Sequence, residues 1–238
     1  MGVNRRSGGC EDEHMTVRAA DELAAVPSPA WPLVVEWIDH SPVTVETIGV
    51  DQDSGLSILY RLQVTASSVL GALALNCGAL LANNGWFKLL GGGGGGLPDL
   101  ATANQLPDDP ALSAGPPGSL LVAVDVLGGR FAVDGGGLGV APGEVCYFGP
   151  DTLQWQGLGG GHADFVHAAL SGGLTEAFQS LRWEGWEDET AALHPDQGLS
   201  LFPPPFTQEG QDISSVSRRA VPLTELLGFY EDAAAQLG

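Results

Sequence analysis

The chain has 238 residues and a mass of 24.6 kDa, with nine lysine and arginine residues against 29 aspartate and glutamate residues. The resulting formal charge of −20 argues against nucleic-acid and membrane partners, because both attract proteins through basic residues. Hydrophobic residues make up 44% of the chain, which is enough for a sizeable core and argues against wholesale disorder. A length of this order suits one compact domain, and it leaves the oligomeric state open.

The cysteines and the longest apolar stretch bear on location. Cys10, Cys77 and Cys146 are odd in number and widely spaced, which is typical of reduced thiols rather than of a disulfide framework. The apolar stretch over residues 69–82 is shorter than the ~18 to 20 residues that a spanning helix needs. We therefore expect a soluble, cytoplasmic protein. The single lysine, Lys88, among many arginines is interpreted as a coding bias of the genome.

The N-terminal residues carry no structural pattern. Residues 1–26 are polar and irregular, so we expect a disordered extension. Met15 opens a more regular stretch and is a candidate for the start of translation.

The first half of the remaining chain alternates helical and strand patterns. Ser28-Pro29 predicts the start of a helix over residues 28–39, because a capping serine precedes a proline suited to the first turn. Asn84-Gly85 predicts a tight hairpin turn. The other expected elements of this half are a strand over 43–47, a helix capped by Ser54, a helix capped by Ser67 or Ser68 that runs to Leu75, and strands over 79–82 and 86–90.

Residues 91–118 are rich in glycine, proline and aspartate, and they begin with six consecutive glycines. We expect a flexible surface loop within a single domain that spans residues 27–238. Three strands with glycine turns follow, and the chain then returns to helices. These elements are expected at 120–124, 130–133 and 144–148 for the strands, and at 163–170, 174–183 and 222–236 for the helices.

Helices at both ends of a run of strands predict an α+β fold, with a central antiparallel meander and helices packed on one face and at both ends.

The familiar catalytic and cofactor motifs have no convincing match. The glycine run at 91–96 is followed by Leu-Pro-Asp rather than by a helix N-terminus, so it lacks the amides that hold a phosphate. His162 and His167 are five residues apart and point to different sides of a helix, so they cannot converge with Asp164 on a metal. Cys146 lies in an apolar strand. We expect no catalytic residue, no metal site and no cofactor.

The segment over residues 181–186 holds the most informative aromatic residues. Trp183 and Trp186 bracket a glycine and follow Arg182. Rings of this kind commonly pack at the edge of a core. Tryptophan and arginine are also enriched among the residues that anchor protein partners. Arg182, Trp183 and Trp186 are therefore candidate partner-binding residues, beside the simpler core-packing interpretation.

Five stretches carry a family resemblance that runs from about Pro29 to the C-terminus. They are PAWPLVVEW at 29–37, NGWFKLLG at 84–91, GEVCYF at 143–148, LRWEGW at 181–186 and DQGLS at 196–200. With them the chain resembles the bacterial family of domains of unknown function numbered 2625. That resemblance implies no catalytic residue.

A second likeness concerns the middle of the chain. Apolar strands with glycine turns lead through Asp151-Thr152-Leu153 to the helix around Phe165, which is similar to the layout of the SUKH superfamily. Many SUKH proteins are bacterial immunity proteins that neutralise toxins, so this likeness implies a binding role without catalysis.

Three functional hypotheses remain open at this point. The leading one is a non-catalytic protein-binding module, with a basic protein such as a toxin as its partner. The alternative is a small-molecule hydrolase with an unrecognised carboxylate and histidine site, which a deep pocket rich in those residues would favour. A housekeeping scaffold is the third.

Overall fold

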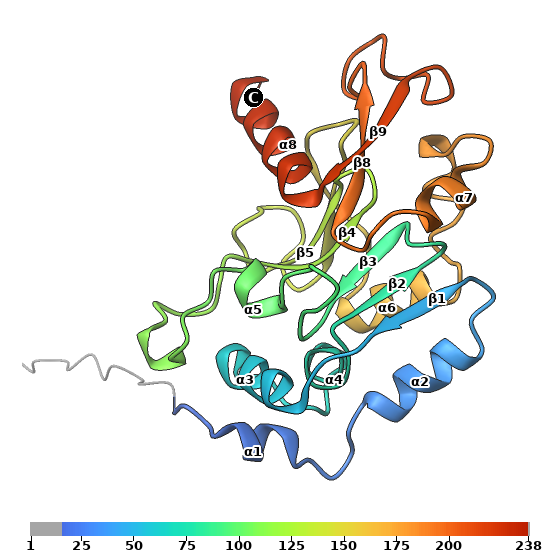
Figure 1. Ribbon diagram of the computed structural model, residues 1–238. Helices are drawn as coiled ribbons and strands as arrows, with labels where there is room; N and C mark the ends of the chain where they lie inside the picture. The colour runs from blue at the N-terminus through green and yellow to red at the C-terminus, as the bar shows by residue number, and fades with distance from the viewer. Residues whose placement is uncertain (1–15, 238) are drawn as a thin grey trace, which may run out of the picture.

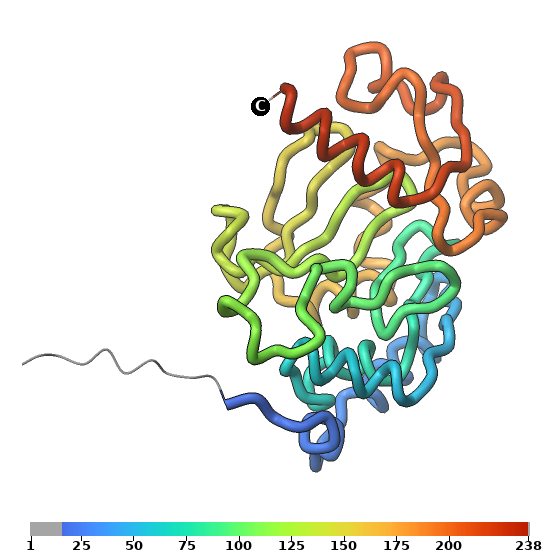
Figure 2. The backbone as a smooth tube through the Cα atoms, turned by 60° about the vertical axis from the view of Figure 1, so that its left-hand side comes forward, coloured from blue at the N-terminus to red at the C-terminus, as the bar shows by residue number. Residues whose placement is uncertain are grey.

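The computed structural model describes residues 16–237, so the candidate start at Met15 and most of the expected N-terminal extension lie outside the described residues. The expected lack of structure up to residue 26 is wrong for helix α1 (Ala20–Ala24), where Leu23 is fully buried. The described chain starts with α1 at one end of the molecule and finishes with helix α8 (Leu223–Leu237) at the other (Figures 1 and 2).

The centre of the fold is a seven-stranded antiparallel meander in which each strand pairs with the next one along the chain. This confirms the α+β class with a central antiparallel sheet. The strands, in order across the sheet, are β1 (Val45–Ile48), β2 (Ala79–Ala82), β3 (Phe87–Leu90), β4 (Ser119–Asp125), β5 (Arg130–Asp134), β6 (Val145–Phe148) and β7 (Trp155–Gly157). The last of these, β7, has too short an apolar pattern to be predicted from the sequence.

The β2–β3 hairpin shows why the sheet has two different faces. The N–H of Trp86 donates to the carbonyl of Asn83 at 3.1 Å, and the two central residues, Asn84 and Gly85, have positive φ of 57° and 77°, as a tight hairpin turn requires. The register pairs Leu80 with Leu89. It also pairs Leu81 with Lys88, and successive side chains of a strand point to opposite faces.

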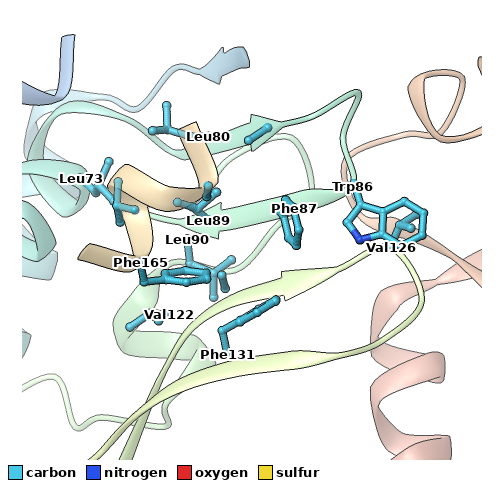
Figure 3. Packing of buried hydrophobic residues seen from close by; sticks show 14 of the residues in the cluster. Leu73, Leu80, Trp86, Phe87, Leu89, Leu90, Val122, Val126, Phe131 and Phe165 are labelled. Carbon is cyan, nitrogen blue, oxygen red and sulfur yellow. The ribbon is translucent and has the colours of Figure 1, made fainter. Parts of the chain in front are cut away.

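One face of the sheet, which carries Leu80 and Leu89, is covered by helices. Figure 3 shows Phe165 of α6 on the same side of the sheet as Leu89 and Phe131, and the rings of Phe131 and Phe165 lie 4.8 Å apart. Helix α6 spans His162–Leu170. Three further helices come before the β2–β3 hairpin in the chain, namely α2 (Trp31–Asp39), α3 (Gln52–Leu62) and α4 (Val69–Asn76). Ser68 caps α4 as predicted, whereas α3 is capped by Asp51 rather than by Ser54.

The opposite face, which carries Leu81, is covered by the C-terminal part of the chain. A two-stranded sheet of β8 (Gln197–Phe202) and β9 (Ser217–Pro222) leads into α8. Leu223 of α8 packs with Leu81 and Val124, and Figure 2 shows α8 running along this side of the molecule. Neither β8 nor β9 is predicted by the sequence patterns, and the helix expected over residues 174–183 is a series of turns that ends in the short 3-10 helix η2 (Gln179–Leu181).

The six-glycine run differs from the expected flexible surface loop. Gly91 and Gly92 are buried, and their N–H groups donate to the carbonyls of Gly78 and Cys77 at 3.0 and 2.8 Å. A Cβ atom on Gly91 would lie only 2.3 Å from the carbonyl oxygen of Cys77, so the close approach requires glycine. The rest of residues 91–118 contains helix α5 (Leu100–Ala103) and the 3-10 helix η1 (Pro110–Leu112).

Candidate functional site

An open cleft of about 620 Å³ lies beside the β2–β3 turn. The edge strand β1 forms one wall, and the segment that joins α7 (Trp186–Ala191) to β8 forms the other. Figure 1 shows α7 beside this end of the sheet. The lining residues are Thr44, Val45, Glu46, Leu81, Asn84, Gly85, Lys88 and residues 190–195.

Lys88 lies at the floor of this cleft because of the strand register. Glu46 of β1 pairs with Leu81 of β2, and Leu81 pairs with Lys88 of β3, so the three side chains form one row on the same face of the sheet. Lys88 is only 2% exposed, whereas Glu46 at the edge of the sheet is exposed. The row therefore runs from an exposed carboxylate, past an apolar side chain, to a largely buried lysine.

The amine of Lys88 has no close partner. No hydrogen bond or ion pair joins it to any group in residues 16–237, and the Asp196 carboxylate acts on it only at longer range. Burial lowers the pKa of Lys88 to about 8, and the Asp196 carboxylate opposes part of that shift. The cleft thus contains a largely buried lysine whose amine lines the open cleft and whose charge is poorly compensated by the protein.

Other polar groups at the rim of the cleft are held by local hydrogen bonds. The Thr44 hydroxyl donates to Oδ1 of Asn84 at 3.1 Å and fixes the β2–β3 turn against β1. Nδ1 of His194 is hydrogen-bonded to Oδ1 of Asp196. The hydroxyl of Thr190 donates to the carbonyl oxygen of Glu187. These bonds fix the walls of the cleft while the amine stays free.

The glycine run supports the wall that carries His194 and Asp196. A Cβ atom on Gly96 would lie 2.7 Å from Oδ2 of Asp196, and one on Gly95 would lie 3.3 Å from Pro195. Both glycines have positive φ, of 82° and 59°. The run therefore brings the backbone close enough to the 195–196 segment to set the position of Asp196 relative to Lys88.

The predicted partner-binding residues lie together, but most of their surface is buried. Arg182, Trp183 and Trp186 are 9%, 6% and 8% exposed. The Arg182 guanidinium stacks over the ring of Trp186 at 4.1 Å and over that of Trp86 at 4.9 Å. The Trp86 and Trp186 rings meet edge to face at 5.2 Å. In this arrangement the two indoles act as core, and a role in partner binding stays a prediction.

The same cluster is tied to the C-terminal hairpin. Nε1 of Trp183 donates to the Glu189 carboxylate at 2.8 Å, and Arg218 of β9 donates to the same carboxylate at 3.1 Å. Nε and Nη2 of Arg182 and Nε1 of Trp86 are buried without a hydrogen-bond partner among the described residues. The Arg182 guanidinium packs its flat face against the indole rings, and such a contact requires few hydrogen bonds.

The structure separates the histidines that were considered as metal ligands. His167 packs against Trp37 with ring centroids 5.1 Å apart, whereas Nδ1 of His162 is buried without a partner and burial lowers the pKa of His162 to about 4. Within residues 16–237, no three His, Cys, Asp or Glu side chains gather as a metal site.

Over the same range, every helix is too short or too polar to cross a membrane.

Sequence reasoning did not select Lys88. The signal was present, because the segment Trp86-Phe87-Lys88-Leu89-Leu90 is a buried-strand pattern interrupted by the only lysine of the chain. A charged residue in such a strand must point into a cavity, to a partner or to solvent. The long-range charge effect of Asp196, more than 100 residues away in the chain, depends on the fold and has no local signal.

Comparisons with other proteins place the chain among relatives whose function is not known. It matches the family described as "Protein of unknown function DUF2625" over residues 20–226. It is 34% identical over 211 residues to the uncharacterised protein YbfG of Escherichia coli (strain K12), which covers 88% of this chain and 94% of that protein. An uncharacterised protein of Haemophilus influenzae is 31% identical over 193 residues, covering 81% of this chain and 84% of the relative. No solved structure matches the chain significantly. The chain therefore belongs to the DUF2625 family.

Proposed function

We propose that this protein binds a small organic molecule in the cleft beside the β2–β3 turn, and that Lys88 contacts the bound molecule directly. The observation that carries the proposal is the burial of the only lysine at the floor of this cleft with no hydrogen-bonding partner in the described chain. Burying an ammonium group without a partner costs folding free energy. A protein keeps such a group most readily where it serves a site.

The size and lining of the cleft suit a small metabolite. Its volume lies within the range of about 300–1,000 Å³ that is usual for ligand sites. Val45, Leu81 and Leu193 supply apolar surface, while Glu46 and His194 supply polar groups at the rim. A ligand with an oxygen-bearing group at its inner end and a polar outer end would match this arrangement.

A ligand screen on the full chain tests the proposal. We expect fragments with carboxylate or carbonyl groups to raise the melting temperature and to shift amide resonances around Lys88 and Asn84. Ala191 is exposed and lines the cleft, so Ala191→Trp should block binding. Ala235→Trp is the matched control, because Ala235 is exposed on α8 away from the cleft lining. Equal binding by both variants, or the absence of any binder, would contradict the proposal.

The hydrolase alternative has partial support in the same cleft. The cleft gathers a carboxylate, Glu46, and a histidine, His194. The hydroxyls of Thr44 and Thr190, however, donate to Asn84 and to the carbonyl of Glu187 rather than to His194. The arrangement therefore supports a role for the Lys88 amine better than attack by an activated hydroxyl.

Binding of a basic protein, such as a toxin neutralised by an immunity protein, is the second candidate function. It is favoured by the net charge of −20 and by the exposed carboxylates of Glu187 and Asp188 in the first turn of α7. Steering by such charges speeds association and weakens as salt rises. The buried, free thiols of Cys77 and Cys146 are compatible with a reducing compartment, and we propose a cytoplasmic location.

Binding kinetics with a basic partner recovered from the native host would test this second function. We expect the association rate to fall as salt rises, and a Glu187→Gln, Asp188→Asn double variant to associate more slowly than the unmodified chain. A double variant on a distant acidic pair, Glu231→Gln with Asp232→Asn, is the matched control. Association that is insensitive to salt and to both changes would contradict electrostatic steering through α7.

A further inference from the structure

We propose that the side-chain amine of Lys88 is a nucleophile that condenses with an aldehyde or ketone bound in the cleft, forming an imine. This inference rests on the proposed function, because it uses the same cleft, and it adds the chemical class of the ligand. It assigns to Lys88 a covalent role rather than a purely electrostatic one.

The geometry around Lys88 favours an amine that reacts. Leu81 and Val124 pair with Lys88 on its two neighbouring strands, so the stem of the side chain lies between apolar neighbours on the same face. The amine lines the cleft and donates to no acceptor in residues 16–237. Its lone pair, once the proton is lost, is therefore not engaged by a neighbour.

Protonation supports the same conclusion. With a pKa of about 8, about one amine in ten is neutral at pH 7, against about one in three thousand for an ordinary lysine. Desolvation in an apolar site is an established way to activate lysine for attack on carbonyl carbon. A carboxylate close enough to form an ion pair would raise the pKa of Lys88 again and keep the amine protonated. Asp196 is too far from the amine to form such a pair.

The reaction balances without an oxidant or reductant. The neutral amine adds to the carbonyl carbon, a carbon–nitrogen bond forms, and the former carbonyl oxygen takes a proton to give a carbinolamine. The carbinolamine then loses its hydroxyl group, which takes a second proton and leaves as water. Both protons come from the lysine nitrogen overall.

The single lysine makes a direct test possible. The full chain is incubated at pH 7 with propanal, pyruvate or glyoxylate in the presence of cyanoborohydride, which reduces an imine to a stable secondary amine. Mass spectrometry of proteolytic peptides then locates the adduct. The only other amine of the chain is its N-terminal α-amino group, which falls on a separate peptide.

An internal comparison distinguishes an activated amine from an ordinary one. Arg219 has a side chain that is 76% exposed, so Arg219→Lys adds a solvated amine to the same molecule. We expect at least one of the three probes to modify Lys88 about tenfold faster than the amine added at position 219, since the larger neutral fraction outweighs the lower access. Ala191→Trp should reduce modification of Lys88 alone.

The outcomes separate this inference from the proposed function. Equal or slower modification of Lys88 with all three probes would overturn the imine inference. Aldehyde or ketone fragments that bind the cleft without forming an adduct would leave the proposed function standing and reject the covalent step. If Ala191→Trp neither blocks fragment binding nor slows the modification, both fail.

Discussion

The hydroxyl of Tyr147 donates a hydrogen bond of 2.7 Å to the carboxylate of Asp125. Asp125 ends β4 and also accepts the backbone N–H groups of Leu127 and Gly129 at 2.9 and 2.8 Å. One carboxylate thereby holds the β4–β5 turn and joins it to β6. Asp125 is fully buried, and burial raises its pKa to about 6 in spite of these hydrogen bonds.

The raised pKa of Asp125 predicts a pH-dependent stability. Between about pH 4 and pH 6 the folded state holds a proton on Asp125 that the unfolded state has lost, so the free energy of unfolding falls as pH rises through this window. Asp125→Asn removes the titration and keeps an acceptor for the turn. We expect the unmodified chain to lose about 2 kcal/mol relative to the variant between pH 4 and pH 7. Urea denaturation at each pH measures this, and a constant difference would contradict it.

Lys88→Met should stabilise the protein at neutral pH. Methionine has a similar length and no charge to desolvate, so the free energy of unfolding at pH 7 should rise by about 1–3 kcal/mol. The lowered pKa means that the unfolded state binds more protons than the folded state between about pH 8 and pH 10.5. The unmodified chain therefore gains stability over that window, and the advantage of the variant should shrink.

Arg219→Met is the control for that substitution, because the Arg219 side chain is exposed. We expect it to change the free energy of unfolding by less than about 0.5 kcal/mol at every pH. Destabilisation by Lys88→Met at pH 7 would show that the amine has a structural partner.

Trp186→Ala distinguishes core packing from partner binding. Removal of an indole that contacts Trp86 and Arg182 should cost about 3–5 kcal/mol of unfolding free energy. Trp186→Phe should retain more of the packing, so it isolates any effect on a partner. A folded Trp186→Ala protein with unchanged stability would favour the prediction that the ring serves as an anchor for a partner.

Gly96→Ala should disturb the wall of the cleft. The added methyl would meet the Asp196 carboxylate in a backbone conformation with φ of 82°, so we expect a loss of about 1–3 kcal/mol and a change in the pKa of Lys88. Gly49→Ala is the matched control, because a Cβ atom at Gly49 meets nothing within 4 Å. Titration of the Lys88 side chain by NMR in both variants checks the coupling. An unchanged Lys88 pKa in Gly96→Ala would show that the glycine run does not position Asp196.

Local patterns predicted those parts of the fold that local chemistry determines. The cap at Ser68 and the turn at Asn84-Gly85 were both identified, because each depends on neighbouring residues. Strand β8 was missed because its partners, β9 and the carbonyl of Val126, lie elsewhere in the chain. The glycine run was misinterpreted for the same reason, since its packing against Gly78 is a tertiary contact.

In the candidate site, too, features that depend on neighbouring residues were visible in the sequence, and features that depend on distant residues were not. The pattern around Lys88 was visible, but the row from Glu46 to Lys88 depends on the register of three strands. The buried state of Trp183 and Trp186 depends on Trp86, which comes about 100 residues earlier in the chain. Sequence reasoning identified the aromatic residues and did not identify the side chains that cover them.

The connectivity of the sheet has a consequence for the order of folding. Each strand of the meander pairs with its neighbour in sequence, so the whole sheet is built from residues 45–157 alone. The wall of the cleft formed by residues 190–195 belongs to a later segment that reaches the sheet through Leu199, whose N–H donates to the carbonyl of Val126 at 2.7 Å. During synthesis on the ribosome, the sheet can therefore form before this wall has emerged. Until the wall arrives, Lys88 stays open to water, and its side chain becomes largely buried only once residues 190–195 have reached the sheet.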